Sequence, residues 1–226
     1  MCFICVLFLN QKELKAQDFV KNYDEASIDP ETIKILRQDF GKQKKTIDAY
    51  EKQILIALSY FQELKAIHIK FRLKKRRTPL ATRPTFFSMF RSAKKRTYII
   101  TISGKSTTYL DTITLKNLRF NAQIGVLGHE LSHISDYITK GFGKMLALGK
   151  NELFYPKLVD QVEYETDLSC INHGLGYQLL DWSINVRDNL NRTNWLGARN
   201  LDKNKNIERY MNPETIKAIL KKHPLY

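Results

Sequence analysis

The stretch NAQIGVLGHELSHISDYI, residues 121–138, decides how the rest of the chain is interpreted. Its centre, HELSH, places His129 and His133 four residues apart with Glu130 between them. On an α-helix this spacing puts both imidazoles on one face beside the carboxylate, which is how HExxH motifs hold zinc next to a general base. The sequence therefore predicts a helix with a metal-binding face.

Apolar residues recur through the same stretch at three- and four-residue steps. They are Ile124, Leu127, Leu131, Ile134 and Ile138. This period is typical of an amphipathic helix, and Leu131 lies roughly 200° around the helix from His129. We therefore expect one face to pack on the core while the face with the imidazoles borders a cleft.

A third metal ligand has to come from elsewhere, because a catalytic zinc ion usually has three protein ligands and one open position. None of the other histidines follows the motif closely; they are His68, His173 and His223. The segment KLVDQVEYETDLSCINHG after Pro156 is expected to be a second helix, and it carries Glu163 with Asp167 one turn later. At this spacing the first carboxylate can bind a metal while the second accepts the free N–H of a ligating imidazole.

These residues carry a family resemblance. HELSH, followed thirty residues later by E-Y-E-T-D, resembles the gluzincin zinc peptidases, the thermolysin-type group. The glutamate segment is most similar to the E-x-x-A-D stretch of HtpX-like peptidases, here in a small soluble form, over roughly residues 66–180. The resemblance implies one Zn²⁺ per chain bound by His129, His133 and Glu163, with Glu130 as general base and Asp167 supporting a ligand without touching the metal.

Several other polar residues are alternatives for these roles. Asp136 lies on the ligand face, although helix-end and surface roles are commoner for such a residue. Glu165 points to the opposite side of the helix from Glu163 and is the second choice for the third ligand. His173 is expected to be structural, with a transition-state contact as the alternative. The residue that stabilises the oxyanion stays open among three tyrosines, Tyr137, Tyr155 and Tyr177. Thr166 departs from the resemblance, since alanine is usual at its position.

Composition narrows the class of protein. The 226 residues are 43% hydrophobic, which is enough for the core of one domain. The net charge of +14 is concentrated in KFRLKKRR (70–77) and RSAKKR (91–96). No nucleic-acid motif accompanies this charge, so specific nucleic-acid binding is not predicted. The three cysteines, Cys2, Cys5 and Cys170, have neither metal-ligand spacing nor a disulfide framework.

The N-terminal segment is expected to lie outside the catalytic fold. Residues 2–9, CFICVLFL, are far fewer than the roughly 20 that span a bilayer. With the LKAQ that follows they resemble a bacterial export signal, although no Lys or Arg precedes them. We expect residues 1–17 to be a signal peptide or a disordered N-terminus, and residues 18–226 to be a single zincin-like metallopeptidase domain. Export to the periplasm or cell envelope is favoured over a cytoplasmic location, and membrane contact is expected at most through this segment.

The expected fold class is α+β, with a small antiparallel sheet packed on the HExxH helix and the glutamate helix, and helical segments at both ends. Strands are predicted at 66–73, 96–103 and 111–118, and a proline-containing loop at 78–84. Further helices are predicted at 29–36, 45–65, 177–188 and 212–220. The strand that pairs with the substrate backbone is expected to be 98–103 or 112–116.

The preferred function is that of a zinc-dependent endopeptidase. A zinc-activated water would attack the peptide bond of a peptide or protein substrate, with Glu130 as the general base. The alternative is a catalytically inactive zincin-like binding protein that uses its basic surface. Glu130 favours the enzyme, because a purely structural site needs no acid–base residue in the gap between its ligands. Cleavage specificity and oligomeric state are not predicted.

Overall fold

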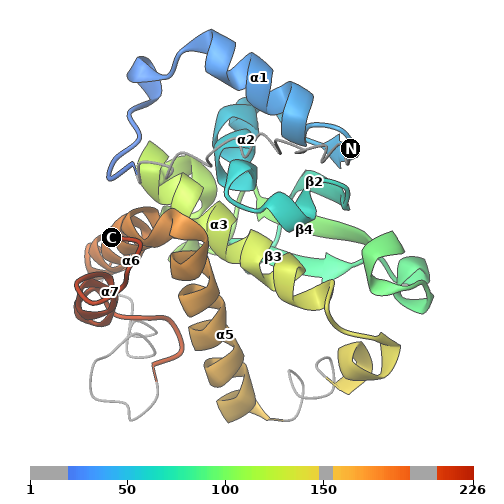
Figure 1. Cartoon of the computed structure of the whole chain (residues 1–226). Helices are drawn as coiled ribbons and strands as arrows, with labels where there is room; N and C mark the ends of the chain where they lie inside the picture. The colour runs from blue at the N-terminus through green and yellow to red at the C-terminus, as the bar shows by residue number, and fades with distance from the viewer. Residues whose placement is uncertain (1–19, 148–154, 194–207) are drawn as a thin grey trace, which may run out of the picture.

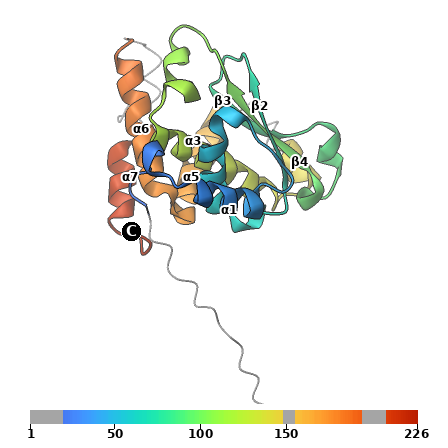
Figure 2. The same cartoon turned by 90° about the horizontal axis from the view of Figure 1, so that it is seen from above.

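The helix that carries HELSH lies at the centre of the molecule. The computed structural model describes residues 20–147, 155–193 and 208–226 (Figures 1 and 2). Helix α3 (Phe120–Tyr137) contacts α2 (Glu51–Ser59), α5 (Pro156–Cys170), α6 (Gly176–Asn191) and strand β3 (Leu80–Pro84). Seen from above, α6 and α7 (Pro213–Leu220) lie at one end and the strands at the other (Figure 2). The predicted helix at 121–138 is therefore confirmed.

Packing explains why α3 holds its place. All five residues of the predicted apolar stripe are buried, none of them more than 9% exposed. Glycine at position 125 lets α6 approach closely, because a Cβ atom there would lie 2.1 Å from the backbone oxygen of Gln178. Real Cβ atoms do not come that near a carbonyl oxygen, so any other residue would push the two helices apart.

The sheet is mixed rather than antiparallel. Its strand order is β1-β2-β4-β3, with β1 (Lys44–Lys45), β2 (His68–Lys74) and β4 (Thr97–Ser103) parallel to one another. Only β3 is antiparallel, and it pairs with β4. The α+β class is thus confirmed, whereas the predicted antiparallel sheet is wrong. The reason is that the chain leaving β2 passes to the far edge as β3 and returns between the two as β4, parallel to β2.

Residues 78–84, predicted as a loop, contain the edge strand β3. Pro79 and Pro84 suggested a break, but a proline is compatible with a strand at its first residue or at an edge. Pro79 precedes β3, and Pro84 is its last residue. Thr85 N donates to Thr97 O and Ser103 N to Pro79 O, so the odd-numbered residues bond to β4 and Pro84 faces outward, where no N–H is required.

Residues 111–118, predicted as a strand, form two 3₁₀ helices, η6 (Leu110–Ile113) and η7 (Leu115–Asn117). Side chains from other helices bind their carbonyl groups and replace a strand partner. Gln123 Nε2 donates to Leu115 O and Leu118 O, each at 2.9 Å, and Asn189 Nδ2 donates to Thr112 O at 2.9 Å. The predicted strand at 111–118 is therefore wrong.

The remaining predicted helices are present, but their lengths can differ from the predicted ones. The helix predicted at 45–65 is shorter, because α2 is flanked by 3₁₀ turns η2 (Asp48–Tyr50) and η3 (Gln62–Leu64). Helix α1 (Pro30–Phe40) begins as predicted, since Asp29 Oδ1 accepts from Glu31 N at 3.1 Å.

Helices α5 and α6 are joined by a π-helical turn, η8 (Ile171–Leu175). Gly174 has φ 97°, a left-handed conformation that glycine adopts without a Cβ clash, so the chain bends there. Cys170, at the end of α5, is a buried free thiol. In the parts of the chain that the structure describes, no helix has the length and apolar character needed to cross a membrane. The predicted leader at 1–17 lies outside the described residues.

Candidate metal centre

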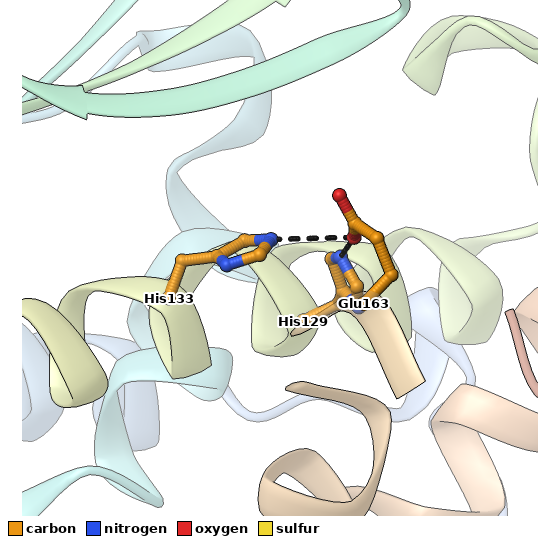
Figure 3. Close-up of side chains that lie close together, drawn as sticks. All are labelled: His129, His133 and Glu163. Carbon is orange, nitrogen blue, oxygen red and sulfur yellow. Dashed lines mark hydrogen bonds and ion pairs between the residues drawn. The ribbon is translucent and has the colours of Figure 1, made fainter. Parts of the chain in front are cut away.

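Three side chains from two helices converge at one point. His129 and His133 lie one turn apart on the same face of α3, and α5 runs beside them and brings in Glu163 (Figure 3). Glu163 Oε2 lies 3.1 Å from His129 Nε2 and 3.5 Å from His133 Nε2. The histidines are 2% and 8% exposed, so little water reaches the imidazoles. The structure thus brings together the three residues predicted as ligands.

The other nitrogen of each imidazole is held by α5. His129 Nδ1 lies 2.8 Å from Asp167 Oδ1, and the second oxygen of Asp167 accepts from the backbone N–H of Met211 at 2.8 Å. His133 Nδ1 lies 3.3 Å from Thr166 Oγ1, whose own hydroxyl donates to Val162 O. Both Nδ1 atoms therefore act as donors, so each Nε2 atom faces Glu163, where it donates when protonated and is free to bind a metal when it is not.

The donor set fits a zinc ion. Ligands 2.0–2.1 Å from a tetrahedral zinc lie about 3.3 Å from one another, and the measured separations of 3.1 and 3.5 Å bracket that value. All three ligand atoms lie within 4.8 Å of one another. Two imidazoles and one carboxylate are also the ligand types that zinc accepts, with the remaining tetrahedral position open.

The site also favours the anionic form of its carboxylate. Burial would raise the pKa of Glu163, but hydrogen bonds from His129 and His133 outweigh it, and the pKa is lowered. Burial would likewise lower the pKa of His129, but the hydrogen bonds to Asp167 and Glu163 raise it well above its usual value. When no metal is bound, the positive charge between the carboxylates of Asp167 and Glu163 is therefore supplied by a proton on the His129 imidazole.

Glu130 lies beside this cluster but outside it. Its side chain is buried, and Oε2 accepts a hydrogen bond of 2.5 Å from the Thr82 hydroxyl on β3. This bond fixes one oxygen and leaves Oε1 for a proton. No feature of the sequence predicted the contact between Thr82 and Glu130, because Thr82 lies in a segment that was expected to be a loop.

A cavity of about 580 Å³ opens next to His129 and Glu130. Most of its wall is apolar and comes from β3, η6, α6 and the residues before α7; it includes Leu80, Ile113, Trp182, Val186, Leu190 and Met211. A site of this size, mostly apolar with a few polar groups at one end, is typical of pockets that bind small molecules or side chains.

Tyr210 lines the cavity and lies beside His129, one of the candidate ligands. Its ring centroid lies 5.8 Å from that of His129 and 5.8 Å from that of Trp182. Burial and the negative charge of Glu163 raise the pKa of Tyr210, so its phenol stays protonated and can donate a hydrogen bond. No sequence motif marks this tyrosine, which lies 43 residues after Asp167.

The alternatives for the third ligand lie elsewhere. Asp136 forms an ion pair with Lys140 at the surface. Glu165 is exposed and accepts from Gln161 Nε2 at 2.8 Å. His173 binds Ser169 O and Glu63 through its two nitrogens and stacks on Phe61 with the ring centroids 4.2 Å apart, which is the structural role expected of it.

The three tyrosines weighed for the oxyanion lie at different distances from the site. Tyr137 stacks on His133, with ring centroids 5.9 Å apart. Tyr177 packs against Tyr226 instead, and Tyr155 is 51% exposed at the start of α5. Of the three, only Tyr137 contacts a candidate ligand among the described residues.

Neither segment proposed for substrate pairing is a free strand edge. Strand β4 has neighbours on both sides, and residues 112–116 are 3₁₀-helical. The edge beside α3 is β3, which no other strand in the described ranges pairs on its outer side. Since the odd-numbered residues bond to β4, the backbone groups of Leu80 and Thr82 point to this open edge.

Comparisons with known proteins do not add to this geometry. No family model, no curated protein and no solved structure matches the chain.

Proposed function

We propose that the protein is a zinc-dependent endopeptidase. One observation carries the proposal. The Nε2 atoms of two imidazoles and a carboxylate oxygen of Glu163 lie as far from one another as the ligands of one zinc ion do, and the Nδ1 atoms of both imidazoles are held by hydrogen bonds. A second carboxylate, Glu130, lies beside these three groups without being one of them. A metal that only supports a fold does not need this extra carboxylate. Bound zinc would supply a Lewis acid that polarises a carbonyl oxygen and lowers the pKa of water.

Glu130 is the proposed general base. It takes a proton from the attacking water on Oε1 and returns it to the nitrogen of the leaving amine. Thr82 keeps the carboxylate oriented through its bond to Oε2. Because Thr82 belongs to β3, the orientation of the base depends on the strand at the edge of the sheet.

That strand is also the proposed support for the substrate backbone. An extended peptide can add to the open edge of β3 through the outward N–H and C=O groups of Leu80 and Thr82. In this position its scissile bond lies near Glu130, since the Thr82 side chain reaches that carboxylate. Substrates are therefore expected to be unfolded or to present an extended segment.

The cavity next to His129 is the proposed site for a large apolar side chain of the substrate. Its volume of about 580 Å³ and its aliphatic and indole lining suit such a group. Tyr210, protonated at neutral pH, is the proposed donor to the oxyanion. Tyr210→Phe should lower kcat on the order of 100-fold and leave KM nearly unchanged, because the interaction forms only in the transition state.

The proposal is tested by zinc content and cleavage of an unfolded protein substrate. Wild type should contain one zinc per chain and cleave, whereas Glu130→Gln should keep the zinc and lose cleavage. Glu165→Gln is the matched control, because Glu165 is an exposed glutamate on α5 whose side chain bonds to Gln161 of the same helix. This control should retain both properties.

Two outcomes would contradict the proposal. Full zinc occupancy with no cleavage in the wild type would favour the alternative, an inactive zincin-like binding protein. Cleavage that survives in Glu130→Gln would exclude Glu130 as the base.

A further inference from the structure

A cluster of exposed phenylalanines lies on the surface, outside the hydrophobic core. Phe86, Phe87 and Phe90 are 66, 85 and 67% exposed, and no other large hydrophobic residue among the described ones is as exposed. They occupy the connection between β3 and β4, and Phe142 joins them with its ring centroid 5.2 Å from that of Phe90. We call these four residues the phenylalanine knob. In Figure 1 the connection between β3 and β4 is the green segment at the right edge, and the segment that follows α3 is drawn in yellow below it.

The surroundings of the knob are cationic. Residues 82–97 and 138–147 contain no Asp or Glu. Five exposed cations lie in these two segments; they are Arg83, Arg91, Lys94, Lys95 and Lys144. None of the five has an ion-pair partner in the described parts of the chain. Exposed rings and exposed cations thus come from the same two segments, which meet at Phe90 and Phe142; we call the five cations the cationic border.

Buried polar bonds beneath the knob hold it in place. Arg96 is 1% exposed, and its guanidinium donates to Arg91 O and Lys140 O, which ties the two segments together. Ser88, also buried, donates to Thr85 O and Thr97 O. The exposed rings therefore sit on a fixed scaffold that need not reorganise to bind a partner.

We propose that the phenylalanine knob and its cationic border dock the protein on an anionic phospholipid bilayer. Phenyl rings carry no hydrogen-bonding group and partition into the boundary between headgroups and acyl chains, while Lys and Arg beside them attract anionic headgroups. Both requirements are met in the same pair of segments. This docking does not depend on the zinc or on peptidase activity.

The chemistry of the knob favours this occupant over three others. Single-stranded nucleic acid stacks on open ring faces, but Phe86 meets Phe87 and Phe90 edge to face, at interplanar angles of 80° and 87°. A second copy of this +14 chain would bring like charges together. The apolar run at residues 2–9 has no acidic group to complement the cations.

The test is sedimentation of the full chain with vesicles of phosphatidylcholine, with or without about 30% phosphatidylglycerol. Wild type should bind the anionic vesicles, and binding should weaken at about 0.5 M salt. Phe86→Ser/Phe87→Ser/Phe90→Ser and Lys94→Glu/Lys95→Glu should each lower the partition coefficient by about 10-fold or more.

Matched controls repeat the same chemical changes elsewhere. Ile35→Ser/Leu73→Ser removes apolar side chains that are 51 and 48% exposed, on α1 and β2. Lys75→Glu/Arg76→Glu reverses two exposed charges at the other end of the sheet. Both controls should bind anionic vesicles as wild type does, and all variants should unfold at wild-type temperatures because the changed residues are exposed.

Three results would overturn the proposal. Unchanged vesicle binding in the phenylalanine variant would locate it elsewhere, for example in residues 1–17. Equal losses in the two charge variants would mean that net charge alone attracts the protein. A different occupant would be identified if the wild type does not bind vesicles, and if it self-associates or binds single-stranded DNA in a way that the phenylalanine variant does not.

Discussion

Strand β3 connects the candidate metal centre with the phenylalanine knob. Charged side chains are usually exposed and apolar ones buried, and each region departs from one half of this rule. At the first, the charged groups His129, Glu163 and Asp167 are enclosed. At the second, phenyl rings that would normally be buried face water. Buried charge and exposed apolar surface both lower the stability of the isolated chain. The two proposals supply a compensating partner for each region, a cation for the first and an anionic bilayer for the second.

The largest effect on this comparison is expected from removing the proposed third ligand, Glu163. Glu163→Ala should abolish stoichiometric zinc, measured by elemental analysis, because two imidazoles alone hold a zinc ion poorly. Wild type should also lose thermal stability when a chelator is added, on the order of 4 kcal/mol if zinc had been present at about 1,000 times its Kd. Glu165→Ala is the control and should keep both zinc and this response. Full zinc occupancy in Glu163→Ala would mean that a different residue is the third ligand.

A weaker perturbation removes a support while keeping all three ligands. Asp167→Asn should retain zinc but weaken its binding by about 10- to 100-fold in chelator competition, because Asp167 orients the His129 imidazole. Thr166→Ala should have a smaller effect, since its contact with His133 is longer, at 3.3 Å. Affinities equal to wild type in both variants would show that α5 contributes only Glu163 to the site.

The interior around the site should be intolerant of added volume. Gly125→Ala should lower the free energy of unfolding by about 3 kcal/mol, because its methyl group would press on the Gln178 carbonyl oxygen. Urea unfolding measures this difference. Gly104→Ala is the control, since nothing lies within 4 Å of a Cβ atom there. A Gly125 variant as stable as the Gly104 variant would mean that α3 and α6 separate at little cost.

A half-buried ion pair should give an intermediate effect that depends on pH. His173 donates to Glu63; burial would lower the pKa of His173, but this bond raises it, and the pKa of Glu63 is lowered. A raised histidine pKa adds stability below its unfolded value, and this stability is lost as pH rises through the folded value. Glu63→Gln should therefore cost on the order of 0.5 kcal/mol at about pH 6 and nearly nothing at about pH 9. Equal losses at both pH values, measured by thermal unfolding, would assign the effect to lost packing.

The smallest effect is expected at the knob. Phe87→Ser should change the free energy of unfolding by less than about 0.5 kcal/mol, because the ring is 85% exposed and makes few contacts inside the chain. Leu64→Ser, at a fully buried position, should destabilise by several times that amount. A large loss in Phe87→Ser would mean that the ring supports the fold rather than a docking surface.

The sequence predicted what depends on local spacing. The turn from His129 to His133 and the turn from Glu163 to Asp167 are fixed by helical geometry, so each pair could be placed before the helices were packed together. Thr82 and Tyr210 could not be found in this way, because their positions near Glu130 and His129 depend on long-range packing. Pro84 was misread as a break because whether a proline interrupts a strand depends on which edge it faces.

The bond between Asp167 and Met211 has a consequence for how the protein is made. One oxygen of Asp167 binds His129, and the other binds a backbone N–H that follows it by 44 residues. While the chain is being synthesised, both helices of the metal centre leave the ribosome before Met211 does. The imidazole of His129 therefore acquires its fully bonded partner only after Met211 has been synthesised, so a nascent chain that stops before Met211 carries all the predicted ligands around an incompletely anchored aspartate.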